Sequence, residues 1–312
     1  MGRGCLIWAD LGGVDVLARF RLNPKNDLVF SCLFGEQESK QNLIALLNAI
    51  LCHHGRRERI ADLEIVTDRR LRRRRVLEKS GILDVLARLD SGEQVNIEMQ
   101  IRDLGNMTKR TLYYLARLYT ATIQRGQDHS RLKRTIVINL LDYEMSPLPS
   151  ERFHHTYHLR ADQAPHEVLT DAWEIHFIEL PKFERAVKDK RNPLHRWLMF
   201  LDEKLAEDNL KELMEMDPAI ESAEKDLERL RSDDEFMRQL AEYQEKSERD
   251  WASSMAFSRE QGKAEGKAEG KAESKVEIVV RMLLIGMDRA TISQLSELPL
   301  QEIERIARTL EE

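Results

Sequence analysis

The stretch from Lys79 to Ile101, KSGILDVLARLDSGEQVNIEMQI, constrains the fold of this chain more than any other. It predicts two β-strands joined by a tight turn at Asp90–Gly92, because two apolar runs flank a Ser-Gly pair. Asp84, Glu98 and Gln100 interrupt these otherwise apolar strands. A carboxylate in an apolar strand is costly unless something pairs with it, and a metal ion is the usual partner. The hairpin is therefore a candidate metal site.

The register of the hairpin decides whether its acidic side chains can meet. Directly opposed residues of an antiparallel pair lie on the same face of the sheet. A two-residue loop would place Asp84 opposite Met99, on the face away from Glu98. A three-residue loop, Asp90–Gly92, with its glycine in the left-handed conformation shifts the register by one residue, as does a β-bulge. Either geometry brings Asp84 onto the face of Glu98, and we predict one of the two.

Length and composition indicate a globular protein with a highly charged surface. The 312 residues are 42% hydrophobic and 33% charged, and the mean hydropathy is −0.51. No run of about 18 apolar residues exists, so no membrane span is expected. The first twenty residues make a poor signal peptide. Three cysteines, Cys5, Cys32 and Cys52, fit no zinc pattern and cannot all pair, which favours a reducing, cytoplasmic compartment.

The charge is distributed unevenly along the chain. The formal net charge is −6, but basic residues cluster at Arg69–Arg75 and between Lys109 and Arg134, and the acidic excess follows residue 200. A basic N-terminal part is compatible with a domain that faces DNA. The Arg69–Arg75 run is either a solvated loop or a phosphate contact, and it helps to bind DNA only if it lies on the side of the acidic residues.

Two helices are predicted before the hairpin. Asn23 suits an N-cap and Pro24 a first helical position, and Gly35 is a plausible end of that helix. Asp27 lies beside the apolar stripe of this helix, either as a first-turn residue stabilised by the helix dipole or as part of the acidic site. A second helix is expected from Glu38 to about Cys52.

The segment 105–126 is predicted to form a helix with two different stripes. Arg110, Tyr113 or Tyr114, and Arg117 form a stripe of cations and aromatics, because they are spaced by three, four or seven residues. Such a stripe suits contact with nucleic acid, and packing on a sheet edge would produce the same pattern. The apolar stripe is expected to comprise Leu112, Leu115, Leu118, Tyr119 and Thr122.

Further strands and helices complete the predicted domain. Residues 134–141 read as a buried strand, and 153–160 and 173–180 as two more. The order helix, strand, hairpin, helix, strand predicts an α/β sandwich with a mixed sheet. The spacing of four histidines matches no metal site, which favours exposed strand histidines; they are His154, His155, His158 and His176.

The C-terminal part is predicted to be helical apart from a repeat. Residues 262–273 read GKAE three times. The repeat gains no i,i+4 ion pairs, and each glycine costs about 1 kcal/mol relative to alanine, so it predicts a marginal helix or a mobile linker. The tail after it could be half of a helix-turn-helix, but it has no basic recognition helix. Packing or homo-oligomerisation is favoured for this region.

Four stretches, in order, resemble the PD-(D/E)XK family of recombination-promoting nucleases and transposase-like proteins. They are NPKNDLVFSCLFG, GILDVLARLDSGEQVNIEMQ, KRTLYYLARLYTATIQRG and KRTIVINLLDYE. The resemblance implies an α/β fold: a restriction-endonuclease-like core with a mixed sheet flanked by helices, plus a helical C-terminal region. The expected organisation is an extension (1–20), a nuclease-like domain (21–181), a helical region (182–258), the repeat as linker (259–274) and a helical tail (275–312).

The resemblance also implies a Mg²⁺-dependent endodeoxyribonuclease that acts on DNA in recombination or mobile elements, in a cytoplasm of bacterial type. Asp84 and Glu98 match the metal-binding acids, and Asp27 matches an acid of the first helix. Gln100 replaces the usual lysine. Because an amide carries no charge, the positive charge must come from elsewhere. Lys109 and Arg110 are the candidate cations, and Lys109, Arg110, Tyr113 and Arg117 are the candidate DNA contacts.

The alternative function is a catalytically silent DNA-binding or assembly protein that keeps the nuclease scaffold. In that case Asp84 would be a strand-end residue bonded to backbone N–H groups, and Glu98 an exposed strand residue. A transposase that joins DNA strands is a weaker third hypothesis, because strand transfer generally needs an acidic triad at wider spacing. The combination of Asp27, Asp84, Glu98 and Gln100 favours the nuclease.

Overall fold

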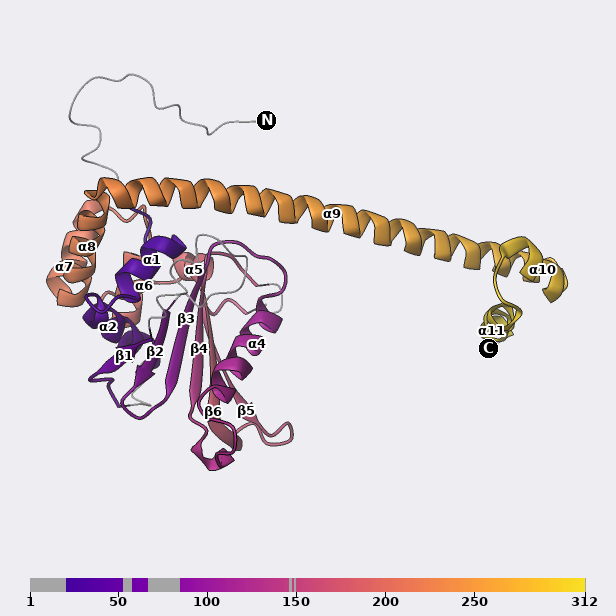
Figure 1. The fold of residues 1–312 in the computed structure, drawn as a ribbon. Helices are drawn as coiled ribbons and strands as arrows, with labels where there is room; N and C mark the ends of the chain where they lie inside the picture. Colours follow the sequence, from indigo (N-terminus) through magenta and orange to yellow (C-terminus); the bar gives the residue numbers. More distant parts are fainter. Residues whose placement is uncertain (1–20, 53–57, 67–84, 146–147, 149, 312) are drawn as a thin grey trace, which may run out of the picture. The chain divides into compact units, whose positions relative to one another are not determined.

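A six-stranded mixed sheet with the strand order β1-β2-β3-β4-β6-β5 organises the first of two compact units, which extends to Leu240 (Figure 1). The computed structural model describes residues 21–52, 58–66, 85–145, 148 and 150–311. Strands β3, β4 and β6 run parallel, and the other neighbours are antiparallel. The strands are β1 (Leu63–Ile65), β2 (Val85–Leu89), β3 (Gln94–Gln100), β4 (Thr135–Leu141), β5 (His154–Arg160) and β6 (Val168–Glu179). The predicted α/β fold with a mixed sheet is confirmed.

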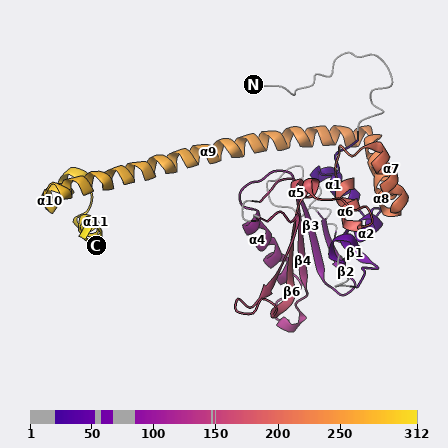
Figure 2. The same cartoon turned by 180° about the vertical axis from the view of Figure 1, so that it is seen from behind.

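Helices cover the sheet and form its main core. Figures 1 and 2 show α1, α2 and α6 beside β1–β3, and α4 beside β4. Val95, Ile97 and Met99 of β3 pack into the large core with the first group. The bounds are α1 (Asp27–Phe34), α2 (Lys40–Leu51), α4 (Met107–Thr120), α5 (Leu180–Arg185), α6 (Pro193–Phe200), α7 (Glu207–Met216) and α8 (Pro218–Arg231).

The hairpin between β2 and β3 has the predicted three-residue turn. Val85 pairs with Ile97 and Ala87 with Val95, and the Leu89 N–H donates to the Glu93 carbonyl over 2.9 Å. Gly92 has a φ of 82°, the left-handed value that closes such a loop. The odd register is therefore confirmed within the described part of the strands. Asp84 precedes Val85 and lies outside the described residues, as does the Arg69–Arg75 run.

Gly92→Ala is expected to destabilise the sheet unit by about 1–2 kcal/mol, because a side chain in the left-handed conformation meets its own backbone. A Cβ at this position would also lie 3.3 Å from Cε of Lys133. The measurement is urea unfolding followed by tryptophan fluorescence. Gly126→Ala, at a glycine with a φ of 86° and open space around it, is expected to show the backbone cost alone, so the difference between the two variants measures the contact with Lys133. Unchanged stability of Gly92→Ala would contradict the proposed importance of this turn.

Helix α1 begins later than predicted. Its N-cap is Asn26, whose Oδ1 accepts hydrogen bonds from the N–H groups of Leu28 and Val29. Asn23 instead accepts from the N–H of Lys25 over 2.9 Å, within the turn that precedes the helix. The prediction of Asn23 as the cap is wrong because two asparagines three residues apart offer equally good caps. The end of the helix at Gly35 is confirmed.

The faces of α4 differ from the predicted stripes. Leu112 is 47% exposed, whereas Thr111 is 1% exposed. The Thr111 hydroxyl donates to Oδ1 of Asn139 on β4 over 3.2 Å. A polar partner on the sheet therefore turns a polar face of the helix inward, which the apolar pattern of the sequence alone could not indicate. The buried residues of α4 are Met107, Thr111, Tyr114, Leu115 and Leu118.

His176 is buried, which contradicts the prediction of exposed strand histidines for this residue. Its Nδ1 lies 2.9 Å from Nε2 of His154, and its Nε2 lies 2.7 Å from Oε1 of Glu174. Arg134 contacts the second oxygen of Glu174. Burial raises the pKa of Glu174, but the hydrogen bonds and charges of His176 and Arg134 outweigh it and lower this pKa to about 2. These contacts connect β5, β6 and the residue that precedes β4, and we interpret them as structural.

The second compact unit starts at Ala241 and is helical. Helix α9 (Asp234–Leu284) runs through the whole GKAE repeat, which is therefore helical. Beyond it, α10 (Arg289–Ser296) and α11 (Leu300–Glu311) pack on the end of α9 through Val279, Ile292 and Ile303. Within the described ranges, no helix is both long and apolar enough to cross a membrane.

Candidate functional site

One face of β3 carries four polar side chains: Gln94, Asn96, Glu98 and Gln100. Asn96 and Glu98 are 0% exposed, and Gln94 is 7% exposed. Because side chains of a strand alternate, this face is opposite the one that enters the main core. β3 therefore has one apolar and one polar face, and its polar face is largely buried.

Three side chains donate hydrogen bonds to the Glu98 carboxylate. Nδ2 of Asn96 donates to Oε1 over 3.0 Å. Nη2 of Arg110 donates to Oε2 over 3.0 Å, and Nε2 of Gln100 lies 3.5 Å from the same oxygen. The buried charge of Glu98 is thereby balanced by one cation and two amides, as a buried carboxylate requires.

Arg110 joins the candidate acid to the glutamine that follows it. Its Nη1 donates to Oε1 of Gln100 over 2.8 Å, while its Nη2 contacts Glu98. The guanidinium lies 5.5 Å from the ring centre of Tyr114, one helical turn further along α4, which favours a cation–π contact. Of the two candidate cations, Arg110 contacts the acid and Lys109 is exposed. Because arginine stays protonated, the charge beside Glu98 is permanent.

The turn before α1 is tied to the ends of β3 and β4. Nζ of Lys25 lies 2.9 Å from Oδ1 of Asp142, and the Asp142 N–H donates to the Gln100 carbonyl over 2.9 Å. These contacts hold the start of α1, and with it Asp27, near the end of β3. Within the described ranges, no group of three His, Cys, Asp or Glu side chains is placed to hold a metal.

The comparison with known families decides which architecture this is. The model of the family described as PD-(D/E)XK nuclease family transposase matches residues 24–258. The chain belongs to this family. The match contains the hairpin, α4 and the whole sheet. Comparisons with curated proteins and with solved structures gave no match.

The PD-(D/E)XK nuclease family implies a divalent metal, and the donor set on β3 fits one chemically. Carboxylate and amide oxygens are the ligands that Mg²⁺ and Ca²⁺ prefer. Oδ1 of Asn96 is buried, and no group in the described part of the chain donates a hydrogen bond to it, although Nδ2 of the same amide contacts Glu98. An unsatisfied buried oxygen beside a carboxylate costs about 1–3 kcal/mol, and a cation or an ordered water would remove that cost.

Asn96 is a residue of this nuclease-family site that sequence reasoning missed. The alternation of Gln94, Asn96, Glu98 and Gln100 was visible in the sequence, but it did not indicate that α4 would cover this face. Tyr114 was predicted only as an alternative to Tyr113. It is 6% exposed and packs on Arg110, whereas Tyr113 is 62% exposed. The two tyrosines therefore have different roles.

A second buried ion pair lies at the end of β6. Nζ of Lys182 is 2.7 Å from Oε2 of Glu179, and both side chains are at most 3% exposed. Oε1 of Glu179 accepts from the Met145 N–H over 2.7 Å, and Nζ of Lys182 also donates to the Leu148 carbonyl over 2.5 Å. The pair thus fastens the segment that follows β4 to the end of β6.

Tyr143 lies in the same segment after β4. Its pKa is affected by charged residues of the Glu98–Arg110 pair and of the Glu179–Lys182 pair. Burial raises its pKa to about 12, with Asp103 and Glu179 adding to the shift and Arg110 opposing it. The phenol therefore stays protonated at neutral pH and can donate a hydrogen bond.

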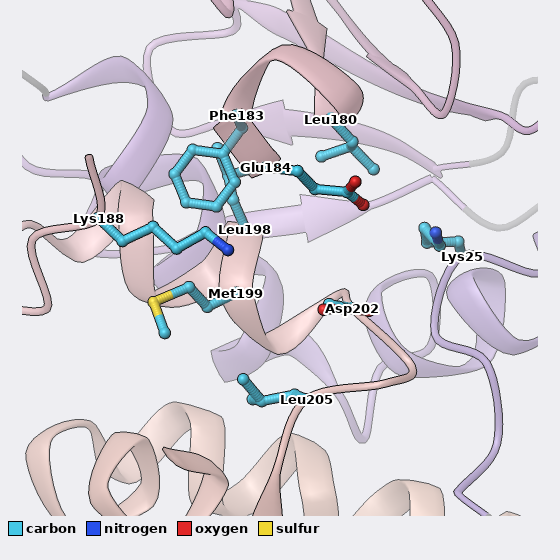
Figure 3. Close-up of a pocket in the computed structure, with 9 residues that line it drawn as sticks. All are labelled: Lys25, Leu180, Phe183, Glu184, Lys188, Leu198, Met199, Asp202 and Leu205. Carbon is cyan, nitrogen blue, oxygen red and sulfur yellow. The ribbon is translucent and has the colours of Figure 1, made fainter. Parts of the chain in front are cut away.

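A small cavity lies between α5, α6 and the turn that holds Lys25 (Figure 3). Its volume of about 20 Å³ accommodates about one water molecule and no organic ligand. Its lining combines apolar side chains with Lys25, Glu184, Lys188 and Asp202. The cavity is therefore no second candidate for a substrate site.

Proposed function

We propose that this protein is a divalent-metal-dependent DNA endonuclease that hydrolyses phosphodiester bonds in recombination or mobile elements. The observation that carries the proposal is the buried Glu98 carboxylate in contact with Gln100 and Arg110 on the central sheet. Family membership supports a nuclease-like or transposase function. DNA is the expected substrate, and the cytoplasm of a bacterial-type cell is the expected compartment.

Asp84, Glu98 and Asp27 are the proposed metal ligands, and Mg²⁺ is the proposed ion. The pairing of Val85 with Ile97 supports Asp84, because it is the odd register that a site shared by Asp84 and Glu98 requires. The turn at Lys25 supports Asp27, since it fastens the start of α1 near Gln100. When bound, the metal would lower the pKa of a water molecule and stabilise charge on the phosphate.

Arg110 and Gln100 together are proposed to replace the usual lysine. The Arg110 guanidinium supplies positive charge for the scissile phosphate, and arginine suits phosphate because it can donate two parallel hydrogen bonds. Gln100 fixes one edge of the guanidinium through its Oε1. Its Nε2 donates to the Met99 carbonyl over 2.9 Å and lies 3.5 Å from Oε2 of Glu98, so the amide positions both the arginine and the acid.

Arg110→Gln is expected to slow DNA nicking about 100- to 1000-fold, the typical effect of removing one charged donor to a transition state. Adding Gln100→Lys to this variant should recover part of the rate, because the lysine returns a positive charge to the strand. The measurement is the initial rate of plasmid nicking, with Lys211→Gln as the control, because Lys211 is an exposed cation on α7. Wild-type activity of Arg110→Gln would contradict the assignment.

A catalytically silent DNA-binding or assembly protein is the second candidate. It is favoured by one observation, that both Glu98 oxygens already accept hydrogen bonds from the protein. Nicking of supercoiled plasmid in Mg²⁺ and in EDTA separates the two functions. Cleavage in Mg²⁺ that stops in EDTA, and that Asp84→Ala and Glu98→Ala abolish, supports the nuclease. Equal nicking by the wild type and both variants would refute it.

A further inference from the structure

The outer face of α4 carries a line of two cations with a tyrosine between them. Lys109, Tyr113 and Arg117 are each four residues apart, so they follow one another along a single side of the helix at intervals of about 6 Å. Tyr113 is 62% exposed, and both cations are exposed. Among the described residues, neither cation forms an ion pair with an acidic side chain.

Tyr113 is connected to the candidate acid through two further side chains of α4. Its ring lies 5.6 Å from the ring of Tyr114 in an edge-to-face arrangement. Tyr114 packs on Arg110, and Arg110 contacts Glu98. The side chains of Tyr114 and Arg110, both from α4, therefore connect the exposed ring to the candidate carboxylate. A ligand that sits on Tyr113 contacts the same helix that supplies Arg110 to the candidate site.

An exposed aromatic ring between two cations matches the chemistry of a nucleotide with an accessible base. The base can stack on the ring, and its flanking phosphates can contact Lys109 and Arg117. Inside a duplex, neighbouring base pairs cover both faces of each base. Only an unpaired base offers a free face to Tyr113. Stacking on an exposed ring of this kind therefore requires an unpaired base, as in single-stranded DNA.

We propose that the Lys109–Tyr113–Arg117 line binds single-stranded DNA by stacking an unpaired base on Tyr113. In combination with the proposed nuclease function, on which this step rests, the preferred substrate carries unpaired bases beside the bond that is cut. Arg110 and Glu98 then act on the DNA backbone, and Tyr113 stacks on a neighbouring base that is not part of a DNA duplex.

The test is fluorescence anisotropy of the full chain in EDTA, where no cleavage occurs, with a labelled single strand and a blunt duplex of equal length. The wild type is expected to bind the single strand more tightly. Tyr113→Ala should weaken single-strand binding about tenfold, the effect of losing one stacked base, and change duplex binding less than about twofold. Tyr113→Trp should retain single-strand affinity. Leu112→Ala, which removes a neighbouring apolar side chain that is 47% exposed, should leave both affinities unchanged.

The two cations provide a second measurement. Lys109→Gln and Arg117→Gln should each weaken single-strand binding and reduce its dependence on salt concentration, because each removes one phosphate contact. Equal affinity of the wild type for both DNA forms, or an unchanged single-strand affinity of Tyr113→Ala, would overturn the proposal. Because these measurements need no cleavage, a failure of the proposed nuclease function would appear separately, as an absence of nicking in Mg²⁺.

Discussion

Replacement of Glu98 by glutamine is expected to lower the rate of metal-dependent DNA nicking about a thousandfold. Glutamine keeps the size of the side chain, and its single amide oxygen can still accept the hydrogen bond from Arg110, so the fold should persist. The charge that attracts the metal is lost, and a metal contributes several kcal/mol to catalysis, at about 1.4 kcal/mol for each factor of ten. The measurement is the initial rate of plasmid nicking at saturating Mg²⁺.

Glu207→Gln is the matched control for this variant, because Glu207 is an exposed carboxylate in the first turn of α7. It should nick at the wild-type rate. Circular dichroism of Glu98→Gln should match that of the wild type, which separates a chemical from a structural loss. A nicking rate of Glu98→Gln within a factor of a few of the wild type would exclude Glu98 as a metal ligand.

Lys182→Met is expected to destabilise the sheet unit by about 3–5 kcal/mol, because it leaves the Glu179 carboxylate buried without its cation. Both partners are almost fully buried, so solvent cannot replace the lost charge. Urea unfolding followed by tryptophan fluorescence measures the effect. This is the largest stability change that we expect from a single substitution outside the candidate site.

The double variant Glu179→Gln with Lys182→Met separates an unpaired charge from lost packing. If the cost comes from the orphaned carboxylate, the double variant should be more stable than Lys182→Met alone. Glutamine can still accept from the Met145 N–H. Additive losses in the double variant would show instead that the two side chains contribute independently.

The hairpin shows how far the sequence could predict the fold. The position of Asp84 and Glu98 within apolar strands required an odd loop, and Gly92 provides it. Local chemistry was sufficient because the turn alone sets the register of two adjacent strands. The cap of α1 was less predictable, since Asn23 and Asn26 both satisfy the local rules.

The surroundings of the candidate site depended on contacts between distant segments. Glu98 and Arg110 lie twelve positions apart in the sequence, on a strand and a helix whose relative rotation no local pattern specifies. For this reason the sequence named Lys109 and Arg110 as equal candidates, and it did not separate the roles of Tyr113 and Tyr114. Asn96 was missed because its importance follows from its burial and its hydrogen bond to Glu98, which no local pattern specifies.

The most direct test of the central claim is a double-mutant comparison of nicking rates for Asp84→Asn, Glu98→Gln and the variant with both changes. If the two acids share one metal, either single change disables the site and the second adds little, as for catalytic groups that act as a unit. The account predicts that the double variant nicks at the rate of the slower single variant. Losses that multiply, or a wild-type rate for Asp84→Asn, would contradict a shared metal site on this hairpin.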